Sequence, residues 1–380
     1  MYEPHFNERK SDFDWALLLC ALGLMCVGAL FIYSAMAGHE SALLWYKQTY
    51  MHQILWYLIG AAAAVALLAV EYGRLARWSG VAYWLTIVLL VAVLIFGTKI
   101  NGARRWIALG FFGLQPSEFA KIAFILLLAN FLSCPAEELR GPRVFWATLG
   151  FTVLPFVLIK QEPDLGSALV FPVISLSMMF VAGVPGRRLV WLMGGTGVLV
   201  GLLVAIILFA PAKSSIEHYQ ERRLLEYFGR SKNSSAGYNV DQALISVGSG
   251  GFKGKGWRHG TQYSLGFLPR AGAHNDFIFS VIAEEEGFVG SVVILALYTG
   301  LLSSGIKIAS QARDRLGQLL AVGVVTLLFC HVFVNIGMNI RLMPVAGIPL
   351  PLLSYGGSSV VCSLIAIGIL HNVHIYRKSY

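Results

Sequence analysis

The chain has 380 residues, of which 57% are hydrophobic and only 13% are charged, and its mean hydropathy is +0.68. Soluble domains carry about 25% charged residues, so this composition excludes a soluble protein and predicts one that crosses a membrane many times. The formal net charge is +9, but the basic residues lie between apolar segments, and we therefore expect no nucleic-acid partner.

Apolar segments of spanning length recur along the whole chain without a break in composition. A membrane-spanning helix needs about 20 apolar residues, and this criterion predicts an all-α integral membrane protein, a polytopic bundle of about ten transmembrane helices. We treat residues 1–380 as a single domain. The expected spans are 15–36, 51–70, 78–98, 117–133, 144–159, 167–184, 189–210, 277–305, 317–340 and 357–375.

The segment before residue 15 is polar and is followed by an apolar run without a small-residue cleavage site, which indicates a tail and not a signal peptide. Basic residues gather in alternate loops, as the positive-inside rule requires of cytoplasmic loops. We therefore place both termini in the cytoplasm. The basic residues on that side are Arg74, Arg77, Arg140, Arg143, Arg187, Arg188, Lys307, Arg313, Arg315, Arg377 and Lys378.

One extracytoplasmic loop, 211–275 between spans seven and eight, is long enough to expect a function for it. It holds nine lysines and arginines against four acidic residues, so its surface attracts anions. Its first part, 211–230, is typical of an amphipathic helix lying on the membrane, although a solvated surface helix fits the same pattern.

A glycine-rich segment, 237–262, occupies the second part of this loop and carries Lys253, Lys255 and Arg258. Exposed backbone N–H groups beside cations suit a bound phosphate. The spacing matches no Walker or Rossmann motif, so the pattern alone is weakly specific.

Two pairs of charged residues stand out in the middle of the chain. Glu118 and Lys121 are three residues apart inside the fourth span, so they share a helix face and can form an ion pair. Such a pair serves either function or the stability of the bundle. Arg104 and Arg105 follow Asn101-Gly102 in a loop, where two guanidiniums could hold a diphosphate or anchor the chain at the interface.

Further polar residues interrupt the later spans. Asp164 begins the sixth span, either as a functional acid or as a helix cap. His331, Asn335 and Asn339 recur every four residues and form one polar stripe on the ninth span, which suits packing as well as substrate contact. The proline- and glycine-rich stretch 341–360 predicts irregular backbone, which a membrane protein tolerates only against protein or a wet cavity.

Asp276 lies at the mouth of the eighth span, beside the basic loop. It is a candidate functional acid, with a helix N-cap as the alternative. Glu284, Glu285 and Glu286 lie about 12 to 15 Å further along the helix and point in different directions at 100° per residue. We therefore expect the glutamates to serve as internal partners for Lys121 or for arginines.

Five stretches of this sequence resemble the SEDS family of cell-wall proteins, the group that contains RodA, FtsW and SpoVE. They are NGARRWIALGFFGLQPSEFAK, EPDLGSALV, GYNVDQALISVGSGGFKGKGWRHGTQ, DFIFSVIAEEEG and MPVAGIPLPLLSYGGSS. They occur in the family's order over nearly the whole chain and are most similar to the RodA branch.

The resemblance implies a peptidoglycan glycosyltransferase of the rod-shape elongation type in the bacterial cytoplasmic (inner) membrane. Such an enzyme polymerises lipid II, a disaccharide-pentapeptide on undecaprenyl diphosphate. The implied partners are lipid II, the membrane lipids and a class B penicillin-binding protein that supplies transpeptidase activity.

The family's essential acid falls on Asp276, which we expect to be the general base. The family's conserved pair falls on Glu118 and Lys121, and its arginine on Arg105. The candidate diphosphate contacts are Arg104, Arg105, Lys253, Lys255 and Arg258. The supporting polar residues inside the membrane are Glu118, Lys121, Asp164, Glu284, Glu285 and Asn335.

The five cysteines have neither metal-ligand spacing nor a disulfide pattern, so we expect no protein-bound metal. A divalent cation, Mg²⁺ or Mn²⁺, would fit at the diphosphate, but no ligand cluster in the sequence requires one.

Two other functions stay open at this point. One is a flippase or transporter for a lipid-linked sugar, since polar groups inside the spans suit that class as well. The other is an inactive scaffold for a penicillin-binding protein, because the loop before Asp276 departs from the family pattern. That loop has two extra residues, lacks the expected glutamate and carries Asn275 where threonine is usual.

Overall fold

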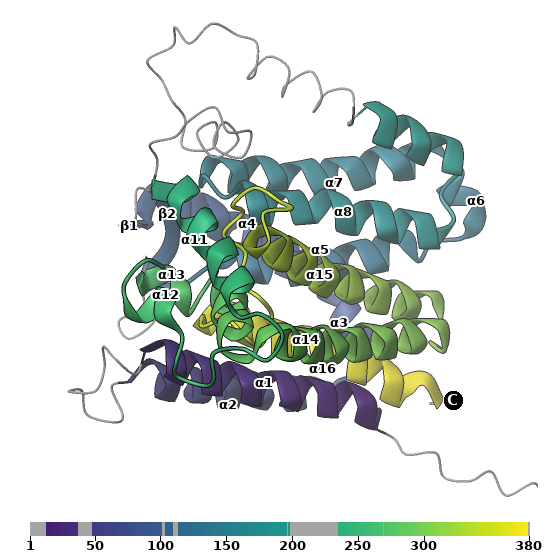
Figure 1. Cartoon of the computed structure of the whole chain (residues 1–380). Coiled ribbons are helices and arrows are strands. Elements are labelled where there is room, and N and C mark those ends of the chain that lie inside the picture. The colour runs from purple at the N-terminus through teal and green to yellow at the C-terminus, as the bar shows by residue number, and fades with distance from the viewer. Residues whose placement is uncertain are drawn as a thin grey trace, which may run out of the picture.

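The computed structural model describes residues 13–36, 48–100, 103–108, 113–195, 197, 235–268 and 270–378. The described helices form a bundle in which the long members run side by side (Figure 1). They are α1 (Trp15–Met36), α2 (Thr49–Leu68), α3 (Tyr72–Arg77), α4 (Ser79–Phe96), α5 (Pro116–Leu132), α6 (Ala136–Leu139), α7 (Pro142–Gln161), α8 (Leu165–Ala182), α11 (Ser235–Ser249), α12 (Thr261–Ser264), α13 (Arg270–Ala273), α14 (Ile278–Ser310), α15 (Arg315–Asn339) and α16 (Gly357–Ile375), followed by the 3₁₀ turn η2 (Tyr376–Lys378).

Among the described residues, 8 helices are long and apolar enough to cross a membrane: α1, α2, α4, α7, α8, α14, α15 and α16. They confirm eight of the expected spans. The expected fourth span forms α5, a shorter helix of 17 residues. The seventh is helical over 186–195, and most of its remainder lies outside the described residues, as does the expected amphipathic helix at 211–230. The protein is therefore a multi-pass membrane protein.

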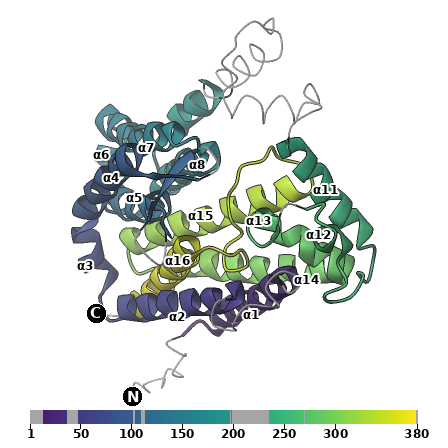
Figure 2. The ribbon, with the colours of Figure 1, turned by 90° about the vertical axis from the view of Figure 1, so that its left-hand side faces the viewer.

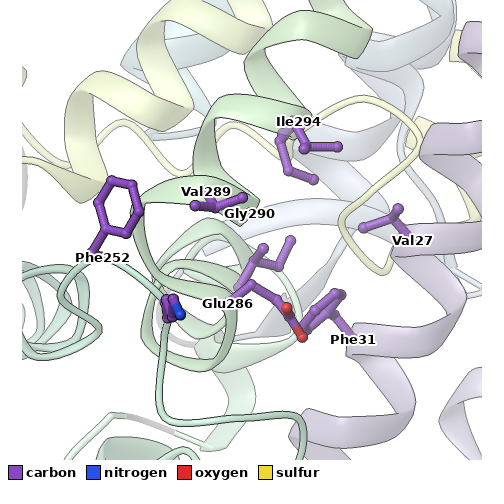
Figure 3. Close-up of a pocket in the computed structure, with 10 residues that line it drawn as sticks. Val27, Phe31, Phe252, Glu286, Val289, Gly290 and Ile294 are labelled. Carbon is purple, nitrogen blue, oxygen red and sulfur yellow. The ribbon is translucent and has the colours of Figure 1, made fainter.

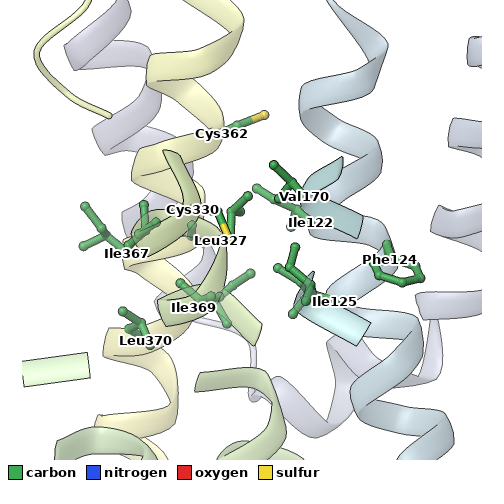
Figure 4. Packing of buried hydrophobic residues seen from close by; sticks show 14 of the residues in the cluster. Ile122, Phe124, Ile125, Val170, Leu327, Cys330, Cys362, Ile367, Ile369 and Leu370 are labelled. Atoms are coloured by element: carbon green, nitrogen blue, oxygen red, sulfur yellow. The ribbon is translucent and has the colours of Figure 1, made fainter. Parts of the chain in front are cut away.

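Helices α15 and α16 occupy the centre of the bundle. Over the most apolar 18 residues of each helix, the buried share is 67% in α15 and 83% in α16, compared with 17% in α2. Viewed from one end, they lie between a group of α4, α5, α7 and α8 and a group of α1, α2 and α14 (Figure 2). Apolar side chains of α5, α15 and α16 meet in this core, including Ile125, Leu327 and Ile369 (Figure 4).

A small antiparallel sheet follows α4, where the sequence predicted only a loop. It consists of β1 (Thr98–Ile100), β2 (Ala103–Ala108) and β3 (Gly113–Leu114), in the order β1-β2-β3. Thr98 pairs with Trp106, and Ile107 pairs with Leu114. The sheet lies at the same end of the bundle as α12 and α13, opposite α6 and the C-terminus (Figure 1); we call it the hairpin end.

Helix α14 is interrupted at Gly287, whose φ of 65° and ψ of −154° are not helical. The glycine-rich segment bridges the break with its own backbone. The amides of Lys255 and Gly256 donate to the carbonyl oxygens of Glu284 and Glu285, at 3.0 and 2.8 Å. On the other side of the break, the amide of Phe288 donates to the carbonyl oxygen of Gly251 at 2.9 Å. Backbone groups that we expected to face a phosphate therefore bind α14.

We infer from length and composition that the membrane-embedded part of α14 begins at this break. The apolar stretch 288–306 is about 28 Å long at 1.5 Å per residue, close to the roughly 30 Å hydrocarbon core of a bilayer. Glu285, just before the break, accepts a hydrogen bond of 2.7 Å from Ser34 in the last turn of α1. The three glutamates thus lie level with the end of a spanning helix. The expected span 277–305 had instead placed them inside the bilayer.

The packing of the glycine-rich segment on α14 predicts a strong effect of a single methyl group. A Cβ on Gly254 would lie 2.0 Å from the Glu285 carbonyl oxygen, and the residue has a φ of +77°. We expect Gly254→Ala to lower the stability by at least about 2 kcal/mol, through overpacking and left-handed strain. Thermal unfolding of the detergent-purified protein measures this.

The matched control is Gly248→Ala in α11, where nothing lies within 4 Å of the added Cβ. Alanine favours a helix over glycine by up to about 1 kcal/mol, so this variant should melt at or above the wild-type temperature. Equal melting temperatures for the two variants would contradict the close packing described here.

Candidate functional site

Asp276 lies in the turn between α13 and α14 and is half-buried. The amides of Asn275 and Phe277 both donate to the carbonyl oxygen of Gly272, at 3.1 and 2.9 Å, and close this turn. The N-cap of α14 is Phe277, which makes no side-chain capping bond. Asp276 is therefore not the N-cap of the helix, and the structural alternative for this acid is wrong.

The backbone carbonyls of three successive residues, 274 to 276, accept hydrogen bonds from α15 and from the segment 340–356. Asn335 and Asn339 of α15 donate to the Asp276 carbonyl oxygen at 3.0 and 3.1 Å. The Ser354 hydroxyl donates to the Asn275 carbonyl oxygen at 2.7 Å. The Tyr355 amide donates to the His274 carbonyl oxygen at 2.9 Å. The backbone that carries the carboxylate is thus fixed by α15 and by the segment 340–356.

The two asparagines are themselves firmly held. Both are fully buried. Asn335 also donates to the Ile348 carbonyl oxygen at 2.8 Å, and Asn339 accepts a bond of 2.6 Å from Ser280. The expected polar stripe on α15 is confirmed, and for its two asparagines the function is to position the Asp276 turn. The irregular segment 340–356 packs against protein, as expected, because Ile348, Leu350, Leu352 and Leu353 are buried.

The third residue of the stripe, His331, belongs to a separate buried group. The Lys121 ammonium lies 2.6 Å from Glu118 and 2.8 Å from Nε2 of His331. The predicted ion pair is therefore confirmed, and the histidine completes it. Lys121 and Glu118 are only 1% and 2% exposed, so this charge pair depends on its hydrogen bonds for stability.

Arg104 and Arg105 point to different partners within the protein. Arg105 donates to the backbone carbonyls of Glu162, at 3.0 Å, and of Pro163, and lies 3.8 Å from Asp164. Arg104 donates to the carbonyls of Leu94 and Ile95 in the last turn of α4, both at 3.3 Å. Each guanidinium therefore has backbone partners within the protein, and Arg105 ties β2 to the start of α8.

Asp164 is the N-cap of α8. Its carboxylate accepts from the Ser167 amide at 3.1 Å and from the Ser167 hydroxyl at 2.9 Å, so the capping alternative is confirmed. Glu162 lies close by, is fully buried, and has no hydrogen-bond partner for either carboxylate oxygen among the described residues. Burial, together with Asp164, raises the pKa of Glu162 to about 9, and Arg105 opposes this only in part.

Glu284 and Glu285 have partners other than those expected. Lys255 binds Glu284 at 2.6 Å, and the Thr261 amide donates to the same carboxylate at 2.8 Å. Glu285 accepts from the hydroxyl of Tyr263 at 2.8 Å, besides Ser34. The prediction that these glutamates pair with Lys121 or with arginines is wrong. Their partners come from the glycine-rich segment, α12 and α1, and Lys255 is thereby withdrawn from the expected diphosphate contacts.

Lys253 and Arg258 remain exposed on the glycine-rich segment. The Arg258 guanidinium lies 5.4 Å from the ring centroid of Tyr33, within the range of a cation–π contact. Lys253 lines a cavity between α1 and α14 together with Glu286. Sequence reasoning gave no role to Tyr33 or Tyr263, because only the fold brings α1 against the loop.

Comparisons with known proteins give one consistent result. A family model described as "Cell cycle protein", for FtsW, RodA and SpoVE, matches residues 14–379. Peptidoglycan glycosyltransferase MrdB of Escherichia coli is 38% identical over 373 residues, covering 97% of this chain and 95% of that protein. Stage V sporulation protein E of Bacillus subtilis is 36% identical, covering 98% of this chain and 100% of that protein.

Solved structures agree with this match. A chain of a peptidoglycan synthase complex, described as coordinating polymerization and crosslinking, superposes with a TM-score of 0.80 at 29% identity, covering 97% of this chain and 99% of that chain. Rod shape determining protein RodA of Thermus thermophilus superposes with a TM-score of 0.68 at 29% identity, covering 99% and 100%.

The buried pair on α5 makes a specific prediction about stability. Lys121→Met leaves the Glu118 carboxylate buried without its cation, which costs about 3–5 kcal/mol. We expect a large drop in melting temperature for this variant and recovery of most of it in Glu118→Gln/Lys121→Met. Thermal scans of the three proteins in one detergent measure this. A double variant as unstable as the single one would show that the unpaired charge is not the cause.

Glu162 predicts a pH dependence of stability. Its pKa is about 9 in the folded protein, against the ordinary value of 4.5 for a glutamate, so the folded state binds the proton more tightly than the unfolded state does. The contribution of Glu162 to the free energy of unfolding is fully present below about pH 4.5 and is lost as the pH rises towards 9. We expect Glu162→Gln to raise the melting temperature at pH 8 and to flatten its fall between pH 5 and 9. An unchanged pH profile in this variant would refute the assignment.

Proposed function

Because the chain belongs to the FtsW, RodA and SpoVE family of cell-cycle proteins, we propose that it is a peptidoglycan glycosyltransferase that polymerises lipid II during rod-shape elongation. Relatives at 38% and 34% identity over nearly the whole chain carry the name peptidoglycan glycosyltransferase. The observation that carries the mechanism is the Asp276 turn, whose three carbonyls are fixed by four donors from α15 and 340–356.

Asp276 is the general base in this proposal. Its carboxylate removes the proton from the 4-hydroxyl of the acceptor sugar as that oxygen attacks the anomeric carbon of the donor. The new glycosidic bond forms while the bond from the anomeric carbon to the lipid diphosphate breaks, and the diphosphate leaves with the electron pair. One carboxylate suffices, because a diphosphate needs little protonation to depart. A rigid turn matters here because proximity and orientation supply much of the rate.

Cations at the hairpin end would stabilise the departing diphosphate. Arg258 and Arg104 are exposed, and we assign the diphosphate contact to them in preference to Lys255 and Arg105, and to Lys253, which lines the cavity between α1 and α14. Among the described residues, no group of three or more His, Cys, Asp or Glu side chains is placed to hold a metal ion. A divalent cation, if used, would therefore take most of its ligands from the diphosphate itself.

The basic residues support an orientation with the hairpin end outside the cytoplasmic (inner) membrane and both termini inside. At the opposite end, Arg315 donates to the carbonyls of Cys134 and Ala182, and Arg188 donates to that of Gly141. Cations are favoured where helices end and in cytoplasmic loops. This orientation puts Asp276 on the side where glycan strands are made.

A class B penicillin-binding protein is the partner that we propose for this chain. The peptidoglycan synthase complex to which the chain is structurally similar is described as coordinating polymerization and crosslinking. A polymerase and a transpeptidase act on successive forms of the same strand, so their association is chemically sensible.

A transporter is the alternative with some structural support, because transporters use discontinuous helices at their substrate sites. Here α14 is discontinuous at Gly287. Carbonyl groups before this break and amides after it are occupied by the glycine-rich segment, so they do not offer a substrate site. This geometry favours the polymerase.

The central prediction concerns Asp276→Asn, which keeps the side-chain size and removes the base. We expect glycan synthesis from labelled lipid II in liposomes to fall by about 10²–10⁴-fold, the usual contribution of general base catalysis. Products are separated on a gel, with and without the partner protein.

The matched control is Asp314→Asn, at the far end of the bundle. Asp314 caps α15 through the Gly317 amide at 2.8 Å, and asparagine caps a helix equally well, so activity should be unchanged. Strand formation that survives in Asp276→Asn would refute the general base. Movement of lipid II between leaflets without strands from the wild type would favour the transporter.

A further inference from the structure

A cavity of about 540 Å³ lies between α1 and α14, on the membrane side of the glycine-rich segment. Its volume is in the range of about 300–1,000 Å³ found for small-molecule sites. Phe31 of α1 and Val289, Val293 and Ile294 of α14 form its apolar walls. Figure 3 shows the Glu286 side chain reaching from α14 towards Phe31.

This cavity opens towards the bilayer. Val289 and Val293 are 47% and 50% exposed, and Phe252 at the rim is 66% exposed. The two valines follow Gly287 and so belong to the membrane-embedded part of α14. An apolar cleft open to hydrocarbon is suited to an alkyl chain and not to a soluble metabolite.

Two opposite charges stand at the polar end of the same cavity. Lys253 and Glu286 both line it, and neither side chain forms a hydrogen bond or an ion pair with the described residues. The neighbouring Glu284 and Glu285 are, in contrast, fully engaged. Glu286 lies level with the last turn of α1, where lipid headgroups meet the hydrocarbon. Unpaired charges at this level are costly unless something binds them.

We propose that this cleft binds a phospholipid with a zwitterionic phosphoethanolamine headgroup. One acyl chain lies along Val289, Val293 and Phe31, the phosphate binds Lys253, and the ammonium binds Glu286. A primary ammonium has three N–H donors for a carboxylate, whereas a trimethylated choline has none and a glycerol headgroup has no cation. The site is separate from Asp276 and goes beyond the proposed polymerase activity.

Lipid retention tests this directly. The protein is taken from vesicles of equal parts dioleoyl-phosphatidylethanolamine, -phosphatidylglycerol and -phosphatidylcholine, and its bound lipids are counted by native mass spectrometry. We expect the wild type to retain the ethanolamine lipid about fivefold over the glycerol lipid, the ratio that one partly exposed ion pair supports. Glu286→Gln should bring that ratio close to one. Lys253→Met should reduce retention of both lipids.

Two further variants distinguish lipid binding in the cleft from general effects of charge or of misfolding. Val293→Trp fills the chain half of the cleft without altering charge and should abolish retention of the ethanolamine lipid. Lys160→Met removes an exposed lysine at the end of α7, away from this cavity, and should leave the ratio at the wild-type value. Only variants with wild-type melting temperatures are compared.

Three results would overturn the proposal. One is equal retention of the ethanolamine and glycerol lipids by the wild type, and another is unchanged enrichment in Glu286→Gln. The third is recovery of a polyprenyl diphosphate lipid, or of a partner's transmembrane helix, in place of the phospholipid. None of these results bears on glycan synthesis, which is measured separately.

Discussion

Backbone polar groups that leave regular helices inside a membrane protein must find partners within the protein, because hydrocarbon offers none. The site of this protein depends on how that constraint is met. The Asp276 turn and the segment 340–356 are both irregular, and they satisfy each other, with Asn335 and Asn339 as intermediaries. Asp276, which we propose as the general base, is therefore carried on backbone whose position follows from the hydrogen bonds of the bundle core.

The sequence predicted the fold well wherever composition decides the outcome. Spans, their order and the irregular segment near the C-terminus follow from hydropathy and from proline and glycine content. The sheet after α4 was missed because its strands are short and lie in a loop. The break in α14 was missed because Gly287 looks like an ordinary glycine in an apolar helix. It becomes non-helical only because the glycine-rich segment, some 30 residues away in sequence, pairs with both sides of it.

The site was predicted in part, for similar reasons. Local spacing predicted the Glu118–Lys121 pair and the stripe on α15. The position of Asp276 beside the basic loop, together with the family resemblance, made it the candidate base, and this role stays a prediction. Local spacing could not show that Lys255 binds Glu284, or that Arg105 binds the carbonyls before α8, since those contacts join segments far apart in sequence. Partner identity is a property of tertiary packing, so charged residues that looked available for substrate proved to be committed to the protein.

The break at Gly287 also divides α14 mechanically. The part before it, with Asp276 just upstream, is bonded to α15, α12 and the glycine-rich segment, whereas the part after it is the apolar stretch whose length matches a bilayer. A change in bilayer thickness tilts embedded helices, and a glycine whose φ and ψ are already non-helical can absorb such a tilt by backbone rotation. Asp276 would then keep its position while the part of α14 after the break tilts with the surrounding lipid. Catalysis by this residue would therefore not depend on the thickness of the membrane.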